Sequence, residues 1–445
     1  MLCTAANFAA VQVVCAARDG GATLFRQVLT GGYRSALPLF EAFAGNETLA
    51  TAEIPAARTE VWRLWRDACA EGTVPVLPTW TTLRADTAYV WTIPDSLERG
   101  VDWTFRYGTK GASPQGPRPL FLYLHGSGPS LQEWATGLRL AEQFDDAPCV
   151  YMIPRIPDER RYRWWHRSKQ WAIEQMLREA MLCDSVDANR LYLFGISEGG
   201  YGAQRIASFY ADYWAGAGPM AGGEPLRNAP VDNIGHIAFS LLTGAEDRMF
   251  FRNRLTRATA EALHCADSSG LSPDGRHRVA LIPGRGHHID YGETTPWLRR
   301  FVRTPRPERF AWEDMEMDGR RRDGFYNLEI LERPCDTLRQ HYRVVMRRGR
   351  IDIAVSDVHY TTLERDPQFG IELAAARRLV PTSGGRLRLY LSEEQYRAGE
   401  KISVYVNGRC AFRGRLRPSR ANMLRSCALF FDRERIFPYA VEVSP

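Results

Sequence analysis

The sequence has 445 residues, enough for two or three domains, and its 44% hydrophobic and 25% charged residues are typical of a soluble globular protein. The net charge of +6 comes mostly from arginines scattered among acidic residues, which argues against a nucleic-acid partner. No segment is apolar over the length of a membrane span, and the nine cysteines show neither zinc-like spacing nor a disulfide framework, although one bridge such as Cys410 to Cys427 fits the sequence.

The amino terminus has two interpretations. Residues 1–17 (MLCTAANFAAVQVVCAA) resemble a signal peptide but lack its positively charged start. We expect export to the periplasm or the extracellular space, and the alternative is a cytoplasmic protein that begins with a frayed helix. Residues 18–83 then repeat apolar residues three and four apart, which predicts a helical N-terminal segment.

Strand-like and helix-like segments alternate from residue 84 to residue 303. Short apolar runs such as PLFLYL, PCVYMIP, RLYLFG and IAFSLLTG are each followed by an amphipathic segment. Regular alternation of this kind predicts an α/β domain with a doubly wound, mostly parallel sheet covered by helices on both faces.

The pattern changes after a proline-containing linker around residues 304–307. Residues 308–445 read as short strands, among them RVVMRRGRIDIAV and KISVYVNGRCAFRG. Asn407 and Gly408 lie between two alternating runs, which is a strong hairpin signal. We therefore predict a C-terminal all-β, sandwich-like domain.

Ser197 lies in the segment LYLFGISEGGYG, where a predicted strand turns into a predicted helix. Gly195 and Gly199 complete the pattern G-x-S-x-G, whose glycines permit close packing around a strained, exposed serine. The pattern alone is weak, and a tight structural turn is the alternative, but the strand–turn–helix context favours a nucleophile.

A serine nucleophile needs a base, which is usually a histidine oriented by a carboxylate. The predicted strand IAFSLLTG is followed by Glu246 and Asp247, and the next strand is followed by His287 and His288. We expect Asp247 and His287 to complete a triad with Ser197, because strand ends are where the sites of such sheets gather.

The same histidines have two other interpretations. Either could be a surface or core histidine without a role in catalysis. His287, His288 and Asp290 could instead bind a metal with His236 or Glu224, but no ligand spacing supports that reading, so we predict no metal and no cofactor.

Acyl transfer also needs N–H donors for the developing oxyanion. We expect one from the backbone of Glu198, the residue after the nucleophile. The loop HGSG that follows an earlier strand would supply the other, from Ser127 or Gly126. The alternative for this loop is a tight turn.

Aromatic and charged residues elsewhere could contact a substrate. Adjacent Trp164 and Trp165 in the segment RYRWWH cannot both face one core from a regular helix, so at least one could line a cleft, although burial as a core anchor is as plausible. The candidate substrate-binding residues are His125, Trp164, Trp165, Glu224 and His288.

Four segments in order, LYLHGSGP, FGISEGGYGAQR, TGAEDRMF and PGRGHHIDY, resemble the α/β-hydrolase superfamily over residues 85–303, more narrowly its bacterial esterase and prolyl-oligopeptidase-like branch. The segments WHRSKQW, GAGPMAGGEP, YGETTPW and WEDMEMDGRRRDGFYNLEI resemble a bacterial group of exported proteins with an added C-terminal β domain. That resemblance implies serine hydrolase chemistry and, through the family pattern GHGIDY, assigns the catalytic histidine to His287.

Three functions remain open. The first is an esterase, with an ester-bearing small molecule or an acylated carbohydrate as its substrate. The second is a serine peptidase of the prolyl-oligopeptidase-like type, although the first 80 residues are too few for a β-propeller. The third is a non-catalytic binding protein on a hydrolase scaffold.

Overall fold

The computed structural model describes residues 21–44, 48–71, 76–77, 81–112, 116–157, 163–268 and 275–445. The predicted signal peptide, residues 1–17, lies outside these residues, as do Arg161 and Tyr162 of the segment RYRWWH. Within the described part of the chain, no helix combines the length and the apolar character that crossing a membrane requires.

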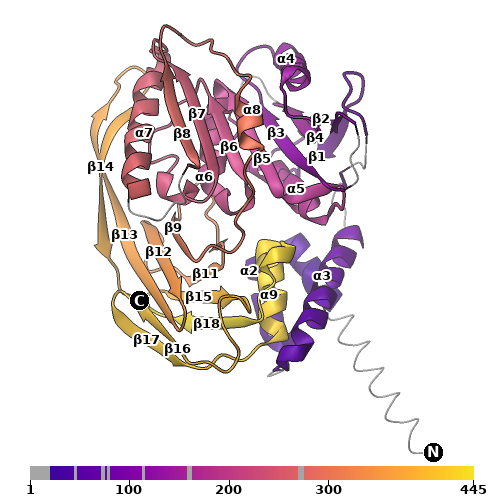
Figure 1. The fold of residues 1–445 in the computed structure, drawn as a ribbon, viewed down its shortest axis with the longest axis vertical. Coiled ribbons are helices and arrows are strands. Elements are labelled where there is room, and N and C mark those ends of the chain that lie inside the picture. The colour runs from indigo at the N-terminus through magenta and orange to yellow at the C-terminus, as the bar shows by residue number, and fades with distance from the viewer. Residues whose placement is uncertain are drawn as a thin grey trace, which may run out of the picture.

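A mostly parallel sheet of eight strands forms the centre of the molecule (Figure 1). Its order is β1-β2-β4-β3-β5-β6-β7-β8, and only the pairs β1–β2 and β2–β4 are antiparallel. The strands are β1 (Tyr89–Thr92), β2 (Asp102–Lys110), β3 (Arg118–Leu124), β4 (Cys149–Arg155), β5 (Val186–Ile196), β6 (Gly216–Met220), β7 (Ala238–Gly244) and β8 (His277–Ile282). This is the sheet of the α/β-hydrolase fold, so the predicted fold class is confirmed.

Helices cover both faces of the sheet. Strands such as β3 and β7 are therefore buried along their whole length. The alternation along β3 shows it: Leu122 packs into the core on the side of α5 and α6, and Tyr123 packs on the side of α4. The helices are α4 (Ser130–Gln143), α5 (Arg167–Leu182), α6 (Glu198–Phe209), α7 (Arg252–Ser268) and α8 (Thr294–Leu298).

The C-terminal part of the chain contains two β sheets, which fits the predicted β domain, although helix α9 (Arg420–Phe430) shows that it is not all-β. One has the order β10-β11-β15-β18 and the other β17-β16-β13-β12-β9, with β14 paired to β13. The strands are β9 (Arg309–Glu313), β10 (Gly324–Phe325), β11 (Leu328–Glu332), β12 (Arg339–Arg347), β13 (Arg350–Arg365), β14 (Glu372–Pro381), β15 (Arg386–Leu391), β16 (Ile402–Val406), β17 (Arg409–Gly414) and β18 (Tyr439–Val443). Asn407 and Gly408 have positive φ between β16 and β17, as the hairpin prediction requires.

This domain also contains a helix that the sequence analysis did not anticipate, α9 (Arg420–Phe430). Ser419 caps it by accepting a hydrogen bond from the Ala421 backbone. Cys427, on this helix, is a buried free thiol, and Cys410 is an exposed free thiol, so the two form no disulfide.

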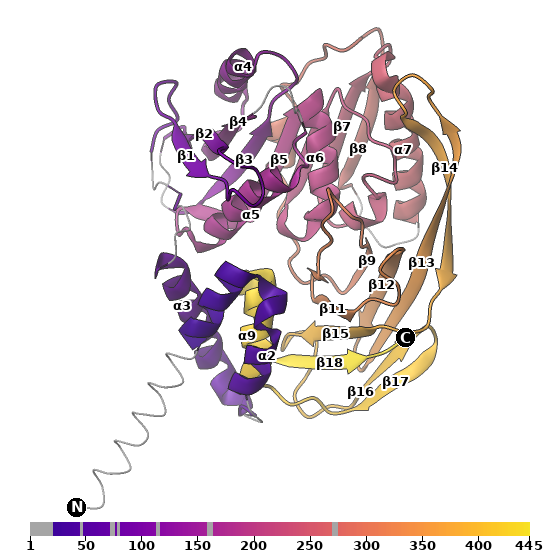
Figure 2. The same cartoon turned by 180° about the vertical axis from the view of Figure 1, so that it is seen from behind.

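The N-terminal helical segment packs against this C-terminal part (Figures 1 and 2). Residues 21–31 are helical, and α2 (Tyr33–Ala44) and α3 (Ile54–Glu71) lie beside α9. Tyr33 donates a hydrogen bond of 2.6 Å to Glu329. Arg58 forms two hydrogen bonds with Glu393, of 2.6 and 2.8 Å. Residues at opposite ends of the chain thus form one helical layer.

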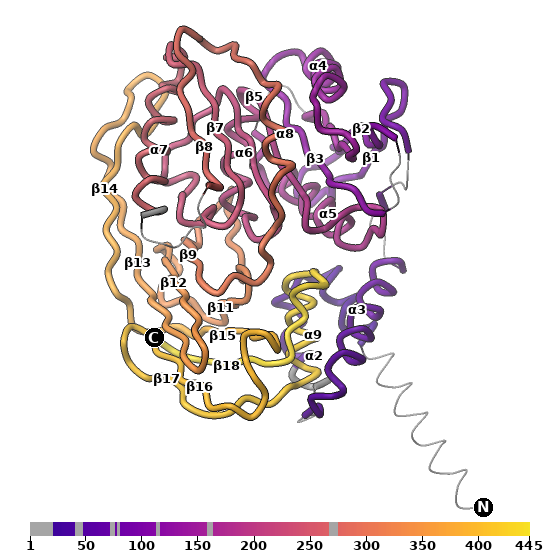
Figure 3. The backbone as a smooth tube through the Cα atoms, in the orientation of Figure 1, coloured from indigo at the N-terminus to yellow at the C-terminus, as the bar shows by residue number. Residues whose placement is uncertain are grey.

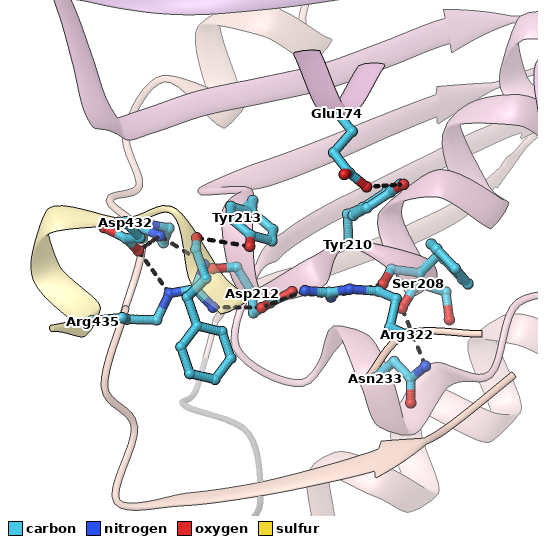
Figure 4. Close-up of polar contacts among 12 residues, drawn as sticks. Glu174, Ser208, Tyr210, Asp212, Tyr213, Asn233, Arg322, Asp432 and Arg435 are labelled. Atoms are coloured by element: carbon cyan, nitrogen blue, oxygen red, sulfur yellow. Dashed lines mark hydrogen bonds and ion pairs between the residues drawn. The ribbon is translucent and has the colours of Figure 1, made fainter. Parts of the chain in front are cut away.

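A buried ionic network joins the central sheet to the C-terminal part (Figure 4). Asp212, in a short 3-10 turn before β6, accepts hydrogen bonds from Arg322 at 2.9 Å and from Arg435 at 2.5 Å. Arg435 also donates to Asp432 at 2.7 Å, and Arg303 reaches the same carboxylate at 2.6 Å. The side chains of Asp212 and Arg435 are fully buried.

Strands β13 and β14 form a long hairpin that extends from the C-terminal sheets along α7 (Figures 1 and 3). An ion pair between Arg254 on α7 and Glu364 on β13 holds the two elements together. The tip of this hairpin therefore lies beside the central sheet, although it belongs to the C-terminal part of the chain.

Candidate active site

The serine turn has the strained geometry that its glycines suggest. β5 ends at Ile196, α6 begins at Glu198, and Ser197 between them has φ 57° and ψ −114°. A Cβ atom at Gly195 would lie 2.2 Å from the Gly199 carbonyl oxygen, and one at Gly199 would lie 1.9 Å from the carbonyl oxygen of Leu124. Both positions therefore require glycine, and Ser197 is held at the carboxyl end of a central strand.

The three residues predicted to form a triad lie within hydrogen-bond distance of one another. His287 Nε2 is 3.0 Å from Ser197 Oγ, and His287 Nδ1 is 2.7 Å from Asp247 Oδ2. Asp247 is 3% exposed and the His287 side chain 36% exposed, so the acid is enclosed while the imidazole borders solvent. This is the arrangement in which an imidazole can take the proton of a serine hydroxyl.

Arg252 is a fourth member of this group that the sequence analysis did not identify. Its Nη1 donates a hydrogen bond of 3.0 Å to Asp247 Oδ1, the oxygen that His287 does not use. Both side chains are almost completely buried. Only the spacing of five residues between acid and arginine is visible in the sequence, and many chains share it by chance.

The loop predicted to form the oxyanion hole lies against the nucleophile. A Cβ atom on Gly126 would lie 3.4 Å from Ser197 Cβ. The Gly126 N–H donates a hydrogen bond to the Glu133 carboxylate. Burial raises the pKa of this carboxyl, and the hydrogen bond reduces the increase without cancelling it. Ser127 faces the cavity beside Ser197, and Glu198 opens helix α6, where the first N–H groups have no intrahelical partner. Ser127 and Glu198 therefore fit the donor role better than Gly126 does.

Ser197 opens into a cavity of about 800 Å³. Its lining includes a connected group of charged and polar side chains, in which Arg205 donates to Glu224 at 2.6 Å and Asn228 donates to the second oxygen of Glu224 at 3.0 Å. The Arg205 guanidinium also lies 3.8 Å from the ring centroid of Trp165, a cation–π contact. Trp165 and Glu224, both predicted to bind substrate, thus line the cavity.

Three other predicted substrate-binding residues lie elsewhere. Trp164 is fully buried and donates to the His125 carbonyl oxygen at 3.0 Å. His125 is fully buried too, and its Nε2 accepts a hydrogen bond from the Ile156 backbone. These two side chains support the segment HGSG from the protein interior, and their full burial keeps them out of contact with a substrate. His288 is exposed, next to His287, and does not line the cavity.

Glu198 combines two roles in one residue, since its backbone begins α6 and its side chain lines the cavity. Burial raises the pKa of its carboxyl to about 7, although Arg163 lowers it, and Glu224 raises it further. Arg163 Nη1 lies 3.6 Å from Glu198 Oε1. The carboxyl next to the nucleophile therefore changes charge near neutral pH.

Comparison with known proteins gives weak likenesses to esterases. No family model matches the chain. It is 29% identical over 158 residues to "Putative esterase NocK" of Nocardia uniformis subsp. tsuyamanensis, a match that covers 34% of this chain and a little under half, 46%, of that protein.

Three solved structures superpose on about half of the chain. They are a thermostable esterase (20% identity, TM-score 0.40, 49% of this chain and 63% of that one), the poly(3-hydroxybutyrate) depolymerase LpqC of Bordetella parapertussis (17%, 0.36, 45% and 84%) and Est1E of Butyrivibrio proteoclasticus (15%, 0.35, 48% and 96%). The sheet order and the strand–serine–helix turn, both features of this chain itself, identify it as a protein of the α/β-hydrolase fold.

Proposed function

We propose that this protein is a serine hydrolase that cleaves a carboxylic ester through an acyl-enzyme. The observation that carries the proposal is the continuous chain of contacts from Ser197 through His287 to Asp247, with the serine open to a cavity of about 800 Å³. A structural serine would need neither the strained backbone nor the two aligned partners.

The first half of the reaction acylates the serine. Ser197 Oγ attacks the ester carbonyl carbon while His287 Nε2 accepts the hydroxyl proton. Asp247 stabilises the imidazolium, and the backbone N–H groups of Glu198 and Ser127 stabilise the oxyanion. When the tetrahedral intermediate collapses, the bond to the leaving oxygen breaks, and His287 gives its proton to the departing alcohol.

The second half regenerates the enzyme. Water attacks the acyl carbon, and His287 Nε2 takes one of its protons. The bond between the acyl carbon and Ser197 Oγ then breaks, the carboxylic acid leaves, and the serine regains its proton from the imidazolium. All of these steps use groups of this chain, with no cofactor.

A sugar is our proposal for the alcohol part of the ester. The supporting observation is that Trp165, Glu198, Glu224 and Asn228 all line the cavity that contains Ser197. An aromatic face with neighbouring carboxylates and amides suits the apolar face and the hydroxyls of a sugar ring.

The test is turnover of p-nitrophenyl acetate, acetylated and feruloylated sugars and Xaa-Pro amides by the wild type and by Ser197→Ala. We expect ester turnover that Ser197→Ala abolishes and that a matched variant of an exposed serine, Ser383→Ala, retains. Amide turnover without ester turnover would favour the peptidase. Failure of a fluorophosphonate to label Ser197, together with no turnover, would favour the non-catalytic scaffold.

A further inference from the structure

The tip of the β13–β14 hairpin forms part of the cavity wall, although it comes from the C-terminal part of the chain. Phe369 and Ile371, in the connection between the strands, both line the cavity that contains Ser197. The α/β-hydrolase sheet is complete without this hairpin, so its tip is an addition to the site and not a part of the basic fold.

An aromatic pair joins the hairpin to the catalytic part. The rings of Phe369 and Phe250 meet edge to face, with their centroids 4.8 Å apart. Phe250 lies three residues after Asp247 and has a positive φ of 53°, which turns this segment sharply. Phe369 remains 49% exposed, and both rings line the cavity. An exposed phenylalanine at a cavity wall is a surface on which an apolar group can bind.

The hairpin is fixed in place on both of its strands. Glu364 on β13 pairs with Arg254, and Glu372 on β14 lies 3.2 Å from Arg227. Within the tip, Asp366 accepts a hydrogen bond of 2.6 Å from the Phe369 backbone. Phe369 is therefore presented by an ordered turn, and an ordered wall can discriminate between substrates because it does not rearrange to fit each of them.

The cavity lining contains both apolar and charged groups. Leu255 and Ile371 line it together with the two phenylalanines. The charged groups include the Arg205–Glu224 pair and the carboxyl of Glu198, and the hairpin itself adds Arg365 and Glu372. A ligand that fills the cavity therefore needs both polar and apolar parts.

We propose that the β13–β14 tip is the specificity-determining wall of the site and that Phe369, together with Phe250, binds a bulky apolar or aromatic part of the ester. This inference rests on the proposed esterase function, because it assigns a subsite to the reaction at Ser197. Phe369 is a binding residue in this proposal and takes no part in proton transfer.

The test compares Phe369→Ala with the wild type on two series of esters. In the first series the acyl group of ethyl esters changes from acetyl to octanoyl and 3-phenylpropanoyl, measured by acid release. In the second the alcohol of acetate esters changes from ethanol to 2-phenylethanol, measured by acid release. The control is Leu363→Ala, a change on the same hairpin at a residue that is 67% exposed and does not line the cavity.

We expect Phe369→Ala to lower kcat/KM for the bulky members of at least one series about tenfold or more, and to leave the smallest member within about twofold. Phe369→Leu should restore part of the loss, because it returns an apolar side chain. Leu363→Ala should match the wild type throughout.

Equal kcat/KM ratios of the wild type and Phe369→Ala across both series would overturn the inference. An equal loss on small and bulky esters with an unchanged melting temperature would overturn it too, since it would indicate a general role. If the wild type neither hydrolyses p-nitrophenyl acetate nor reacts with a fluorophosphonate, the proposed function itself fails. Small-ester turnover without the predicted discrimination would reject only the subsite.

Discussion

Asp247 divides its two carboxylate oxygens between two partners: Oδ2 lies 2.7 Å from His287 Nδ1, and Oδ1 accepts a hydrogen bond of 3.0 Å from Arg252. A buried carboxylate with one partner could rotate away from the imidazole. The guanidinium opposes this rotation, since its charge-assisted hydrogen bond holds the second oxygen. Arg252 therefore acts through Asp247 as a positioning residue.

Replacement of Arg252 by glutamine should lower kcat for p-nitrophenyl acetate about 10-fold to 100-fold. That range corresponds to the loss of one charge-assisted hydrogen bond, about 1.5–3 kcal/mol. We expect KM to change much less, because the small ester makes little use of the cavity wall. Steady-state kinetics of the purified variant give both values.

The matched control is Arg248→Gln, since the Arg248 side chain is 82% exposed and pairs with Glu246 at the surface. Its kcat should remain within about twofold of the wild type. A loss confined to KM in Arg252→Gln would contradict the positioning role and assign Arg252 to substrate binding.

The carboxyl of Glu198 should make the rate fall above neutral pH. Burial raises its pKa to about 7, so it is neutral below that pH and negative above it. A negative charge beside the developing oxyanion raises the barrier to acylation. We expect the ratio of kcat/KM for wild type over Glu198→Gln to be close to one at pH 5.5 and to decrease severalfold by pH 8.5.

Taking that ratio cancels the titration of groups that both proteins share. The remaining pH dependence of the ratio therefore reports the effect of the Glu198 charge on the reaction at Ser197. A ratio that stays constant from pH 5.5 to 8.5 would show that the Glu198 charge does not reach the reacting atoms.

Much of the central fold could be predicted from the sequence, because its strands are short apolar runs followed by amphipathic helices. The triad geometry could be anticipated for a related reason: Ser197, Asp247 and His287 each follow a strand of one parallel sheet, and such strands end at the same edge. Their catalytic roles remain predictions, while their proximity is a property of the structure.

Other features depend on contacts between distant segments, which no local pattern reports. The contact between Phe250 and Phe369 arises only when the C-terminal hairpin folds along α7. Helix α9 was missed because its buried residues surround it and give little amphipathic periodicity, for example Arg425 and Cys427. Trp164 was ambiguous because a tryptophan in a core and one in a cleft look alike in a sequence.

Glu179 should make the protein less stable as the pH rises. It is a buried residue of α5, and burial raises the pKa of its carboxyl to about 7, against the lowering effect of a hydrogen bond from the Leu77 backbone. In the unfolded chain the carboxyl ionises near its usual value of about 4.3, so between these two pH values the unfolded state releases a proton that the folded state keeps. The contribution of the Glu179 carboxyl to the free energy of unfolding is complete below that usual pKa, and it is lost as the pH rises through about 7.

Glu179→Gln should therefore gain stability relative to the wild type as the pH increases from 4.5 to 8, by on the order of 2–3 kcal/mol in total. Urea denaturation at a series of pH values measures this difference. Glu142→Gln, which changes an exposed residue of α4, is the control and should follow the wild type. A Glu179→Gln difference that does not vary with pH would argue that the carboxyl is solvated in the folded protein.

In the contact between the sheet and the C-terminal part, we expect substitution of Asp212 to lower the free energy of unfolding most. Burial would raise the pKa of its carboxyl, but Arg322 and Arg435 outweigh that effect and lower the pKa. Asp212→Asn keeps the shape and removes the charge, which leaves two buried guanidinium groups without their shared anion (Figure 4). We expect the free energy of unfolding to fall by about 3–5 kcal/mol, measured by urea denaturation.

The control for Asp212→Asn is Asp352→Asn, which weakens partly exposed ion pairs with Arg350 and Arg347 and should cost less than about 1 kcal/mol. The activity of Asp212→Asn, measured under conditions where it remains folded, shows whether the network positions the β13–β14 hairpin in addition to stabilising the fold. Because the β13–β14 hairpin belongs to the part that this network attaches, loosening the attachment should weaken turnover of bulky esters more than that of p-nitrophenyl acetate. Unchanged discrimination, with reduced stability, would show that the hairpin is positioned by its contacts with α7 alone.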